Sequence, residues 1–90
     1  MYVLVEHHIN DPSAFWPTDI DAFKAAIPSH LTLHHAFAAR DGNHGVCLWE
    51  AESVETLRGW LDPAMGDTSR NVYHEVVNRE GIATPAAVPA

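Results

Sequence analysis

Apolar and polar residues alternate over four short segments of the chain, and this period of two is typical of half-buried β-strands. In the first segment, Val3, Val5 and His7 share one face. Glu6 and His8 share the other face. The alternation predicts strands over residues 2–9, 31–39, 44–51 and 72–77.

Two further segments repeat apolar residues at the spacing of an amphipathic helix. The first begins at the N-cap Thr18 and ends at Pro28, and the second begins at the N-cap Ser53. Asp62-Pro63 is predicted to break or kink the second helix, and Pro63 to start one more turn that ends near Gly66. The apolar stripes are Ile20, Phe23 and Ile27 in the first helix and Val54, Leu57 and Leu61 in the second.

Asp41-Gly42 predicts a hairpin between the second and third strands. A loop of two or four residues places His35 on the same face as Glu50 and His34 on the opposite face with Trp49, whereas a three-residue loop exchanges these partners. His35 then lies directly opposite Glu50 or diagonal to it, and directly opposed Cβ atoms are about 5 Å apart. The two side chains either satisfy each other as a cross-strand pair or act together as ligands or catalytic groups.

The element order β-α-β-β-α-β predicts a ferredoxin-like α+β fold with a four-stranded antiparallel sheet. Both helices would cover one face of the sheet, and an aromatic loop over residues 15–17 would fold onto the core. Small proteins of this pattern commonly pair their uncovered faces, so by analogy we expect a homodimer that forms a dimeric α/β barrel. Residues 1–80 form this single domain, and residues 81–90 are predicted to form a flexible tail.

Ninety residues with 47% apolar and 19% charged composition are typical of one globular domain. The formal net charge is −7, with one Lys and four scattered Arg, which argues against nucleic acid and anionic membrane surfaces as partners. The start of the chain lacks the pattern of a signal peptide, and no apolar run is long enough to span a bilayer. A single cysteine, Cys47, excludes an internal disulfide, and a cytoplasmic location is expected.

The chain has seven histidines, and neutral imidazole is a common metal ligand. Adjacent histidines in a strand point to opposite faces, so neither His7-His8 nor His34-His35 can chelate one ion through both rings. His7 and His34 are expected to face the helices as hydrogen-bonded structural imidazoles, and His30 and His44 lie in or beside loops. The candidate metal ligands are Glu6, His8, His35, Glu50 and His74.

The segment HHAFAARDGNHGVCLWEAESVETLR resembles the centre of a family of small bacterial ferredoxin-like domains of uncharacterised function. The resemblance covers roughly residues 33–58, and His35, Cys47, Trp49 and Glu50 occupy corresponding positions. Some members of that family are described as nickel-binding, which implies a similar activity here. The chain departs from the family in the extra His34, in the loop DPSAFWP and in the segment DPAMG.

Three functions are compatible with these features. The first is a small cytoplasmic dimeric module that binds nickel or zinc through His and Glu side chains on the open sheet face. The second is a small enzyme, of the isomerase or cofactor-free monooxygenase type, that uses a His–carboxylate pair in a cavity to move a proton on a small molecule. The third is a structural or regulatory dimer without a site. Cys47 is expected to be a buried filler and not a nucleophile.

Overall fold

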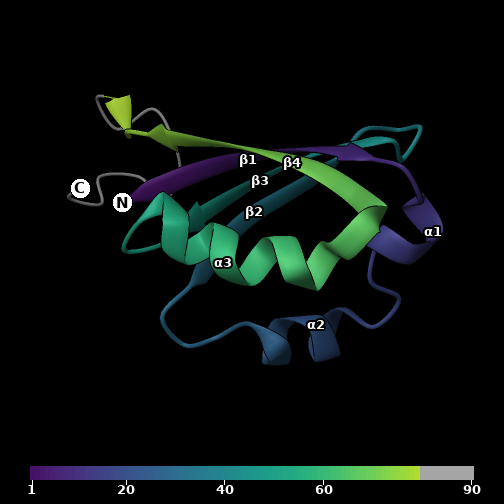
Figure 1. The fold of residues 1–90 in the computed structure, drawn as a ribbon, viewed down its shortest axis with the longest axis horizontal. Helices are drawn as coiled ribbons and strands as arrows, with labels where there is room; N and C mark the ends of the chain where they lie inside the picture. The colour runs from purple at the N-terminus through teal and green to yellow at the C-terminus, as the bar shows by residue number, and fades with distance from the viewer. Residues whose placement is uncertain (80–90) are drawn as a thin grey trace.

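A computed structural model describes residues 1–79 of the chain as a four-stranded antiparallel sheet with three helices (Figure 1). The sheet has the order β2-β3-β1-β4, so the first strand is central. The elements are β1 (Tyr2–Ile9), α1 (Pro12–Phe15), α2 (Ile20–Ala26), β2 (Thr32–Ala38), β3 (His44–Glu50), α3 (Val54–Met65), a 3-10 turn (Gly66–Thr68) and β4 (Ser69–Val76). The α+β class and the four strands are confirmed, and the predicted tail over residues 81–90 lies outside the described residues.

The hydrophobic core lies between α3 and the sheet face that the helices cover. Val3 and Val5 of β1 are fully buried there, together with Leu57 and Leu61 of α3. Trp49 of β3 completes this core, and its ring lies 5.8 Å from that of Trp60 in an edge-on contact. Burying each large side chain contributes about 1.5–3 kcal/mol.

Helix α3 begins and ends at the residues that the sequence indicated. The Ser53 hydroxyl accepts a hydrogen bond from the backbone N–H of Thr56 at 3.0 Å, which is the expected N-cap. The helix ends at Gly66, whose φ of 57° is one that glycine adopts without strain. Of the predicted break or kink at Asp62-Pro63, the break is wrong, because the helix continues through Pro63 to Met65; the further turn that ends near Gly66 is confirmed.

The aromatic segment before the first long helix was expected to be a loop, but its start forms the short helix α1. The Asp11 carboxylate caps this helix by accepting a hydrogen bond from the N–H of Ala14. Trp16 then lies against the β2–β3 hairpin, where its indole N–H donates to the Gly42 carbonyl at 3.2 Å. A Cβ atom on Gly45 would lie 2.9 Å from the Trp16 ring, so the lack of a side chain at this position leaves room for the indole.

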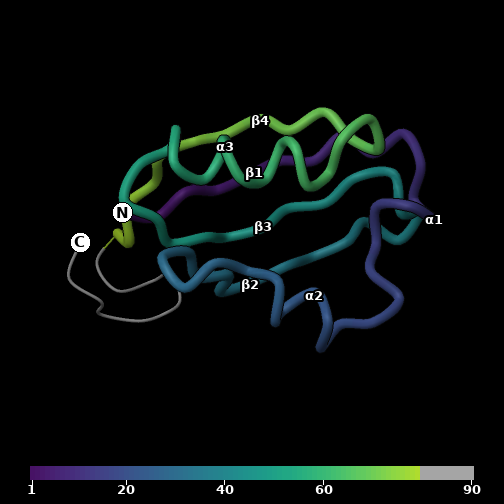
Figure 2. Tube along the Cα trace, turned by 60° about the horizontal axis from the view of Figure 1, so that its bottom comes forward, coloured from purple at the N-terminus to yellow at the C-terminus, as the bar shows by residue number. Residues whose placement is uncertain are grey.

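Helix α2 stands away from the sheet, as both views of the backbone show (Figures 1 and 2). Its N-cap is Asp19, which accepts a hydrogen bond from the N–H of Ala22 at 3.0 Å, and not the predicted Thr18. None of its residues is buried, and Ile20 is 52% exposed. Ile20 and Phe23 of the predicted stripe therefore line a cavity, whereas Ile27, the C-cap residue, packs against the core.

A β-bulge in β2 changes the predicted faces of two residues. The ladder pairs Leu33 with Trp49 and then His35 with Leu48, so His34 is an extra residue between the two pairs. Leu33 consequently lies on the helix-covered face, and His34 reaches the opposite face, both contrary to prediction. The prediction that His35 faces the same side as Leu48 is confirmed.

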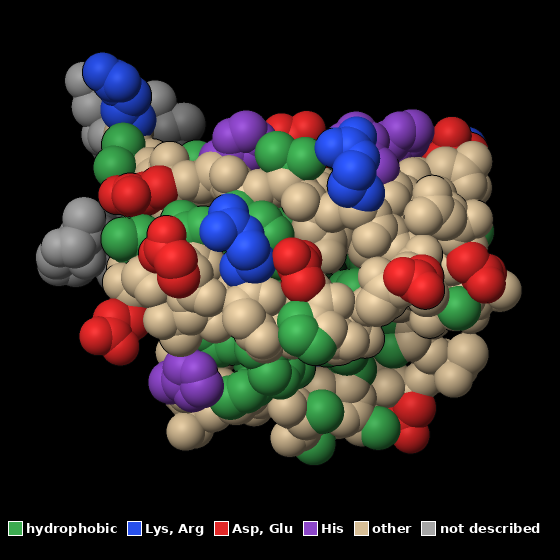
Figure 3. Space-filling model, in the orientation of Figure 1, with side chains coloured by type: hydrophobic (Ala, Val, Ile, Leu, Met, Phe, Trp, Pro, Cys, Tyr) green, Lys and Arg blue, Asp and Glu red, His purple; other side chains and the backbone are tan. Residues whose placement is uncertain are grey.

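The sheet face that carries no helix is called the open face below. Its members include Leu4, Glu6 and His8 of β1, His34, His35 and Phe37 of β2, His44, Val46, Leu48 and Glu50 of β3, and Val72, His74 and Val76 of β4. In the space-filling view, histidine side chains gather along the edge of the molecule where this face lies (Figure 3). Phe37 is 67% exposed and Val46 38% exposed on it.

Candidate functional site

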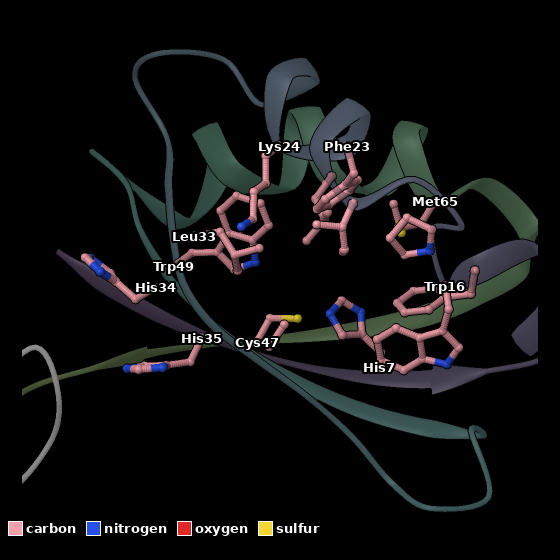
Figure 4. Close-up of a pocket in the computed structure, with 15 residues that line it drawn as sticks. His7, Trp16, Phe23, Lys24, Leu33, His34, His35, Cys47, Trp49 and Met65 are labelled. Carbon is pink, nitrogen blue, oxygen red and sulfur yellow. The ribbon is translucent and has the colours of Figure 1, made fainter.

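A cavity of about 300 Å³ lies between the helix-covered face of the sheet and α2 (Figure 4). Because α2 stands away from the sheet, residues of β2 such as Ala36 remain accessible beneath it. Most of the wall is apolar or aromatic, and Phe15, Trp16 and Phe23 contribute to it. This space, called the helix-side cavity below, has the composition of a small-molecule site.

His7 lines the helix-side cavity, although it is only 2% exposed. It lies in β1 opposite Gly45 of β3, whose missing side chain is replaced by the ring of Trp16. On its other side it lies opposite Asn71 of β4, and the His7 Nδ1 and Asn71 Oδ1 atoms are 2.6 Å apart. Phe15 packs on the imidazole with 5.0 Å between ring centres.

A chain of hydrogen bonds behind His7 fixes which ring nitrogen carries the proton. The Asn71 amide N–H donates to the Asp62 carboxylate at 2.9 Å, and the Tyr73 hydroxyl donates to the same carboxylate oxygen at 2.6 Å. Because an ionised carboxylate only accepts hydrogen bonds, the Asn71 amide must direct its NH₂ group to Asp62 and its oxygen to His7. His7 therefore donates from Nδ1, and its Nε2 atom keeps a lone pair for a ligand in the cavity.

Burial keeps this imidazole neutral at physiological pH. Desolvation lowers the pKa of His7 below its ordinary value of 6.5, while the hydrogen bond to Asn71 and the charge of Asp62 act in the opposite direction. The other titratable residues that line the cavity are His34 and His35 of β2, Cys47 of β3 and Lys24 of α2. A neutral imidazole with one free nitrogen in a mainly apolar cavity is able to accept a proton from a bound molecule.

Cys47 and Trp49 form the floor of the same cavity. Burial raises the pKa of the Cys47 thiol to about 11, so it is a neutral filler and not a nucleophile, in agreement with the prediction. Trp49 is only 1% exposed, and its indole N–H is buried without a hydrogen-bond partner. An unsatisfied buried donor is rare in native proteins and costs about 1–3 kcal/mol.

Comparison of the chain with protein-family models, with curated proteins and with solved structures found no match. Among residues 1–79, no helix is long and apolar enough to cross a membrane. The cytoplasmic location stays a prediction.

The five predicted metal ligands all lie on the open face, where three of them belong to two separate carboxylate–imidazole pairs. The Glu6 carboxylate is 2.7 Å from His74 Nε2 across β1 and β4. The Glu50 carboxylate is 2.9 Å from His34 Nε2, and not in the predicted pair with His35. The β-bulge causes this exchange, because it turns His34 toward Glu50.

The remaining two predicted ligands lie beside other rings. His8 contacts His44 edge-on with 5.7 Å between ring centres, and His35 stacks beside Phe37 at 6.0 Å. Within the described part of the chain, no group of three or more His, Cys, Asp or Glu side chains is close enough to hold a metal ion. Glu50 pairs with Tyr2 and Glu6 lies four residues further along β1, so the two pairs are about 13 Å apart.

The four positions that carry the family resemblance are divided between the two faces of the sheet. His35 and Glu50 lie on the open face, whereas Cys47 and Trp49 line the helix-side cavity. Within the described residues, they do not form a group able to hold a metal ion.

Sequence reasoning missed the arrangement around His7. The alternation in β1 correctly placed His7 on the helix-covered face as a hydrogen-bonded imidazole. Its partner Asn71 lies just before the predicted start of the last strand, which in the structure begins earlier, at Ser69. If the last strand is extended to include Asn71, that residue lies opposite the buried His7. This extension is the signal by which the sequence could have identified the pair.

Proposed function

We propose that this chain binds a small, mainly apolar organic molecule in the helix-side cavity and that His7 moves a proton on it. The observation that carries the proposal is the state of the His7 imidazole: buried, neutral, held through Nδ1 by Asn71 at 2.6 Å, and free at Nε2. An apolar cavity of about 150 Å³ holds benzene, so a cavity about twice as large has room for a molecule of two fused rings.

The reaction that fits these residues is a proton shift without any redox step. His7 Nε2 takes a proton from a carbon next to a carbonyl group, and the electron pair of the broken C–H bond moves onto the carbonyl oxygen to give an enolate. The imidazolium, stabilised by the Asn71 oxygen and the Asp62 charge behind it, then returns the proton to the same or a neighbouring atom. The net change is exchange or isomerisation, which corresponds to the isomerase type predicted as the alternative function.

The test uses 2-tetralone, an enolisable ketone with two fused rings. In D₂O, NMR follows the replacement of its C1 hydrogens by deuterium. We expect the protein to accelerate this exchange and His7→Gln to remove about 99% of the acceleration, since a positioned general base contributes about 10²–10⁴-fold. The matched control is His8→Gln, the neighbouring residue on the open face, which should retain the full rate.

A second pair of variants tests the cavity itself. Ala36→Phe fills the space from β2 and should abolish the exchange, whereas Ala38→Phe, on the same face of the same strand but outside the cavity lining, should not. An unchanged rate in both His7→Gln and Ala36→Phe would refute the proposed function.

The open face supports a second proposal, a ferredoxin-like subunit that pairs with a second copy as a dimeric α/β barrel. The strand order β2-β3-β1-β4 and the helices on one side agree with that fold. Phe37 of the edge strand β2 and Val46 of β3, which lie opposite each other on the open face, are exposed at 67% and 38%. Four strands of about eight residues cover roughly 500 Å² in projection, of the same order as the roughly 800 Å² that each partner buries in a stable dimer.

Metal binding by this dimer is the other function that the open face supports. Each pair, Glu6–His74 and His34–Glu50, offers one carboxylate and one imidazole, and a second copy would supply the remaining ligands for nickel or zinc. Calorimetric titration with Ni²⁺ and Zn²⁺ tests this role. Affinity should fall in His74→Ala and His34→Ala and be unchanged in His30→Ala, which is exposed in a loop. Equal affinities in all three variants would exclude the open face as the metal site.

A further inference from the structure

The end of the helix-side cavity that lies away from His7 carries two donor groups that the proposed proton transfer does not use. One is the Trp49 indole N–H, which is buried without a partner in a residue that is 1% exposed. The other is the ammonium group of Lys24, the only lysine of the chain. In Figure 4 the Lys24 side chain points from α2 toward Trp49, and His7 lies on the far side of Cys47.

These two groups have the chemistry of an anion anchor. A neutral indole N–H donates one hydrogen bond and accepts none, and an ammonium group donates up to three. Apart from histidines, no other basic side chain lines the cavity within the described residues. The chain as a whole carries a formal charge of −7. The ammonium directed into the apolar cavity is therefore a positive group in a mainly negative molecule.

The register of the sheet sets the length of molecule that reaches both ends. Gly45, which lies opposite His7, and Trp49 are four residues apart on β3, a separation of about 13 Å between their Cα atoms. A molecule of two fused rings with one substituent spans most of this length, because the side chains at both ends extend into the space.

From this arrangement we infer that the ligand is an apolar carboxylic acid, whose carboxylate accepts hydrogen bonds from Trp49 and Lys24 while its apolar body extends to His7. The inference rests on the proposed small-molecule function of the helix-side cavity and adds its substrate class. The carboxylate satisfies the Trp49 donor, which otherwise stays unpaired, and the apolar body contacts the aromatic wall.

The experiment compares three probes of one shape: 2-naphthoate, 2-naphthamide and 2-ethylnaphthalene. Their affinities are measured by fluorescence, and the tryptophan indole N–H resonances by NMR. We expect 2-naphthoate to bind best, about tenfold more tightly than 2-ethylnaphthalene, because a hydrogen bond to a charged acceptor is among the stronger ones. The Trp49 resonance should move downfield, and that of Trp16, which already donates to Gly42, should not.

Two variants separate the contributions of the donors. Trp49→Phe should weaken both the carboxylate and the amide, since each accepts from the indole. Lys24→Met should weaken 2-naphthoate alone, by about threefold, as for an exposed ion pair. Lys24 is exposed on α2, so its substitution leaves the core intact and remains informative if Trp49→Phe does not fold.

The outcomes distinguish the anchor from the cavity. Equal affinity for 2-naphthoate and 2-ethylnaphthalene, with resonances of Cys47 and His7 shifted by both, overturns the carboxylate anchor and leaves the cavity as a binding site. A failure of all three probes to shift these resonances overturns both the anchor and the proposed function.

Discussion

Replacing Asn71 by Leu tests the hydrogen-bond chain that prepares His7. The substitution removes the acceptor of the His7 Nδ1–H, and His7 is 2% exposed, so water has little access to replace Asn71. A buried donor left without a partner costs about 1–3 kcal/mol. The bond of Asn71 to Asp62 is exposed and that to Ser69 is part-buried, and their loss adds about 0.5 kcal/mol. The expected loss is therefore centred on about 2.5 kcal/mol, within a range of about 1.5–3.5 kcal/mol.

The assay is urea denaturation at pH 8, where His7 is neutral in the folded and the unfolded chain. For a domain of this size, 1 kcal/mol corresponds to about 4–8 °C in melting temperature, so Asn71→Leu should melt roughly 10–20 °C lower. Ser69→Ala is the matched control, because it removes another donor to the same Asn71 oxygen and leaves the His7 bond intact. It should cost less than about 1 kcal/mol.

A double-mutant cycle isolates the pair itself. In a His7→Phe background there is no Nδ1–H to leave unsatisfied, so Asn71→Leu should cost at least about 1 kcal/mol less than in the wild type. Equal costs in the two backgrounds would refute the reasoning, because the histidine and the amide would then be independent. The assignment of the proton to Nδ1 of His7 would then no longer be supported, and neither would the free lone pair on Nε2.

Three further outcomes are expected. Because burial lowers the folded-state pKa of His7, the unfolded chain binds more protons below pH 6.5, and stability should fall as the pH drops from 6.5 toward the folded pKa. Urea titrations at several pH values should show this loss of stability, with a slope of at most about 1.4 kcal/mol per pH unit. The variant His7→Gln should have a smaller slope. Gly45→Ala places a Cβ 2.9 Å from the Trp16 ring and should cost about 1–3 kcal/mol in thermal melts, whereas an unchanged melting temperature would mean that the ring moves freely. Phe37→Glu should shift a dimer to monomers in sedimentation experiments, and an unaffected dimer would place the interface elsewhere.

The sequence predicted the fold well where short-range patterns decide it. The alternation in β1 and the stripe of Leu57 and Leu61 in α3 each lead directly to the observed buried residues. The pattern failed at His34, because a β-bulge is a property of two strands together, and one strand alone does not reveal where the extra residue lies. One inserted residue was enough to change the partner of Glu50 from His35 to His34.

The candidate site was much less accessible to sequence reasoning. The cavity exists because α2 stays away from the sheet, and an apolar stripe such as Ile20 and Phe23 ordinarily predicts packing. The hydrogen-bond chain joins residues from β1, β4 and α3 that are far apart in sequence, from His7 to Asp62 and Asn71. Such a convergence follows from strand register and helix placement, which local composition does not encode.

The absence of buried residues in α2 has a consequence for how such a protein can change. Mutations in residues 20–26 alter the roof over the cavity but remove nothing from the core beneath α3. Substitutions in this short helix can therefore change which ligand binds while the protein stays folded. A library randomised at Ile20, Phe23 and Lys24 should retain a high proportion of folded members.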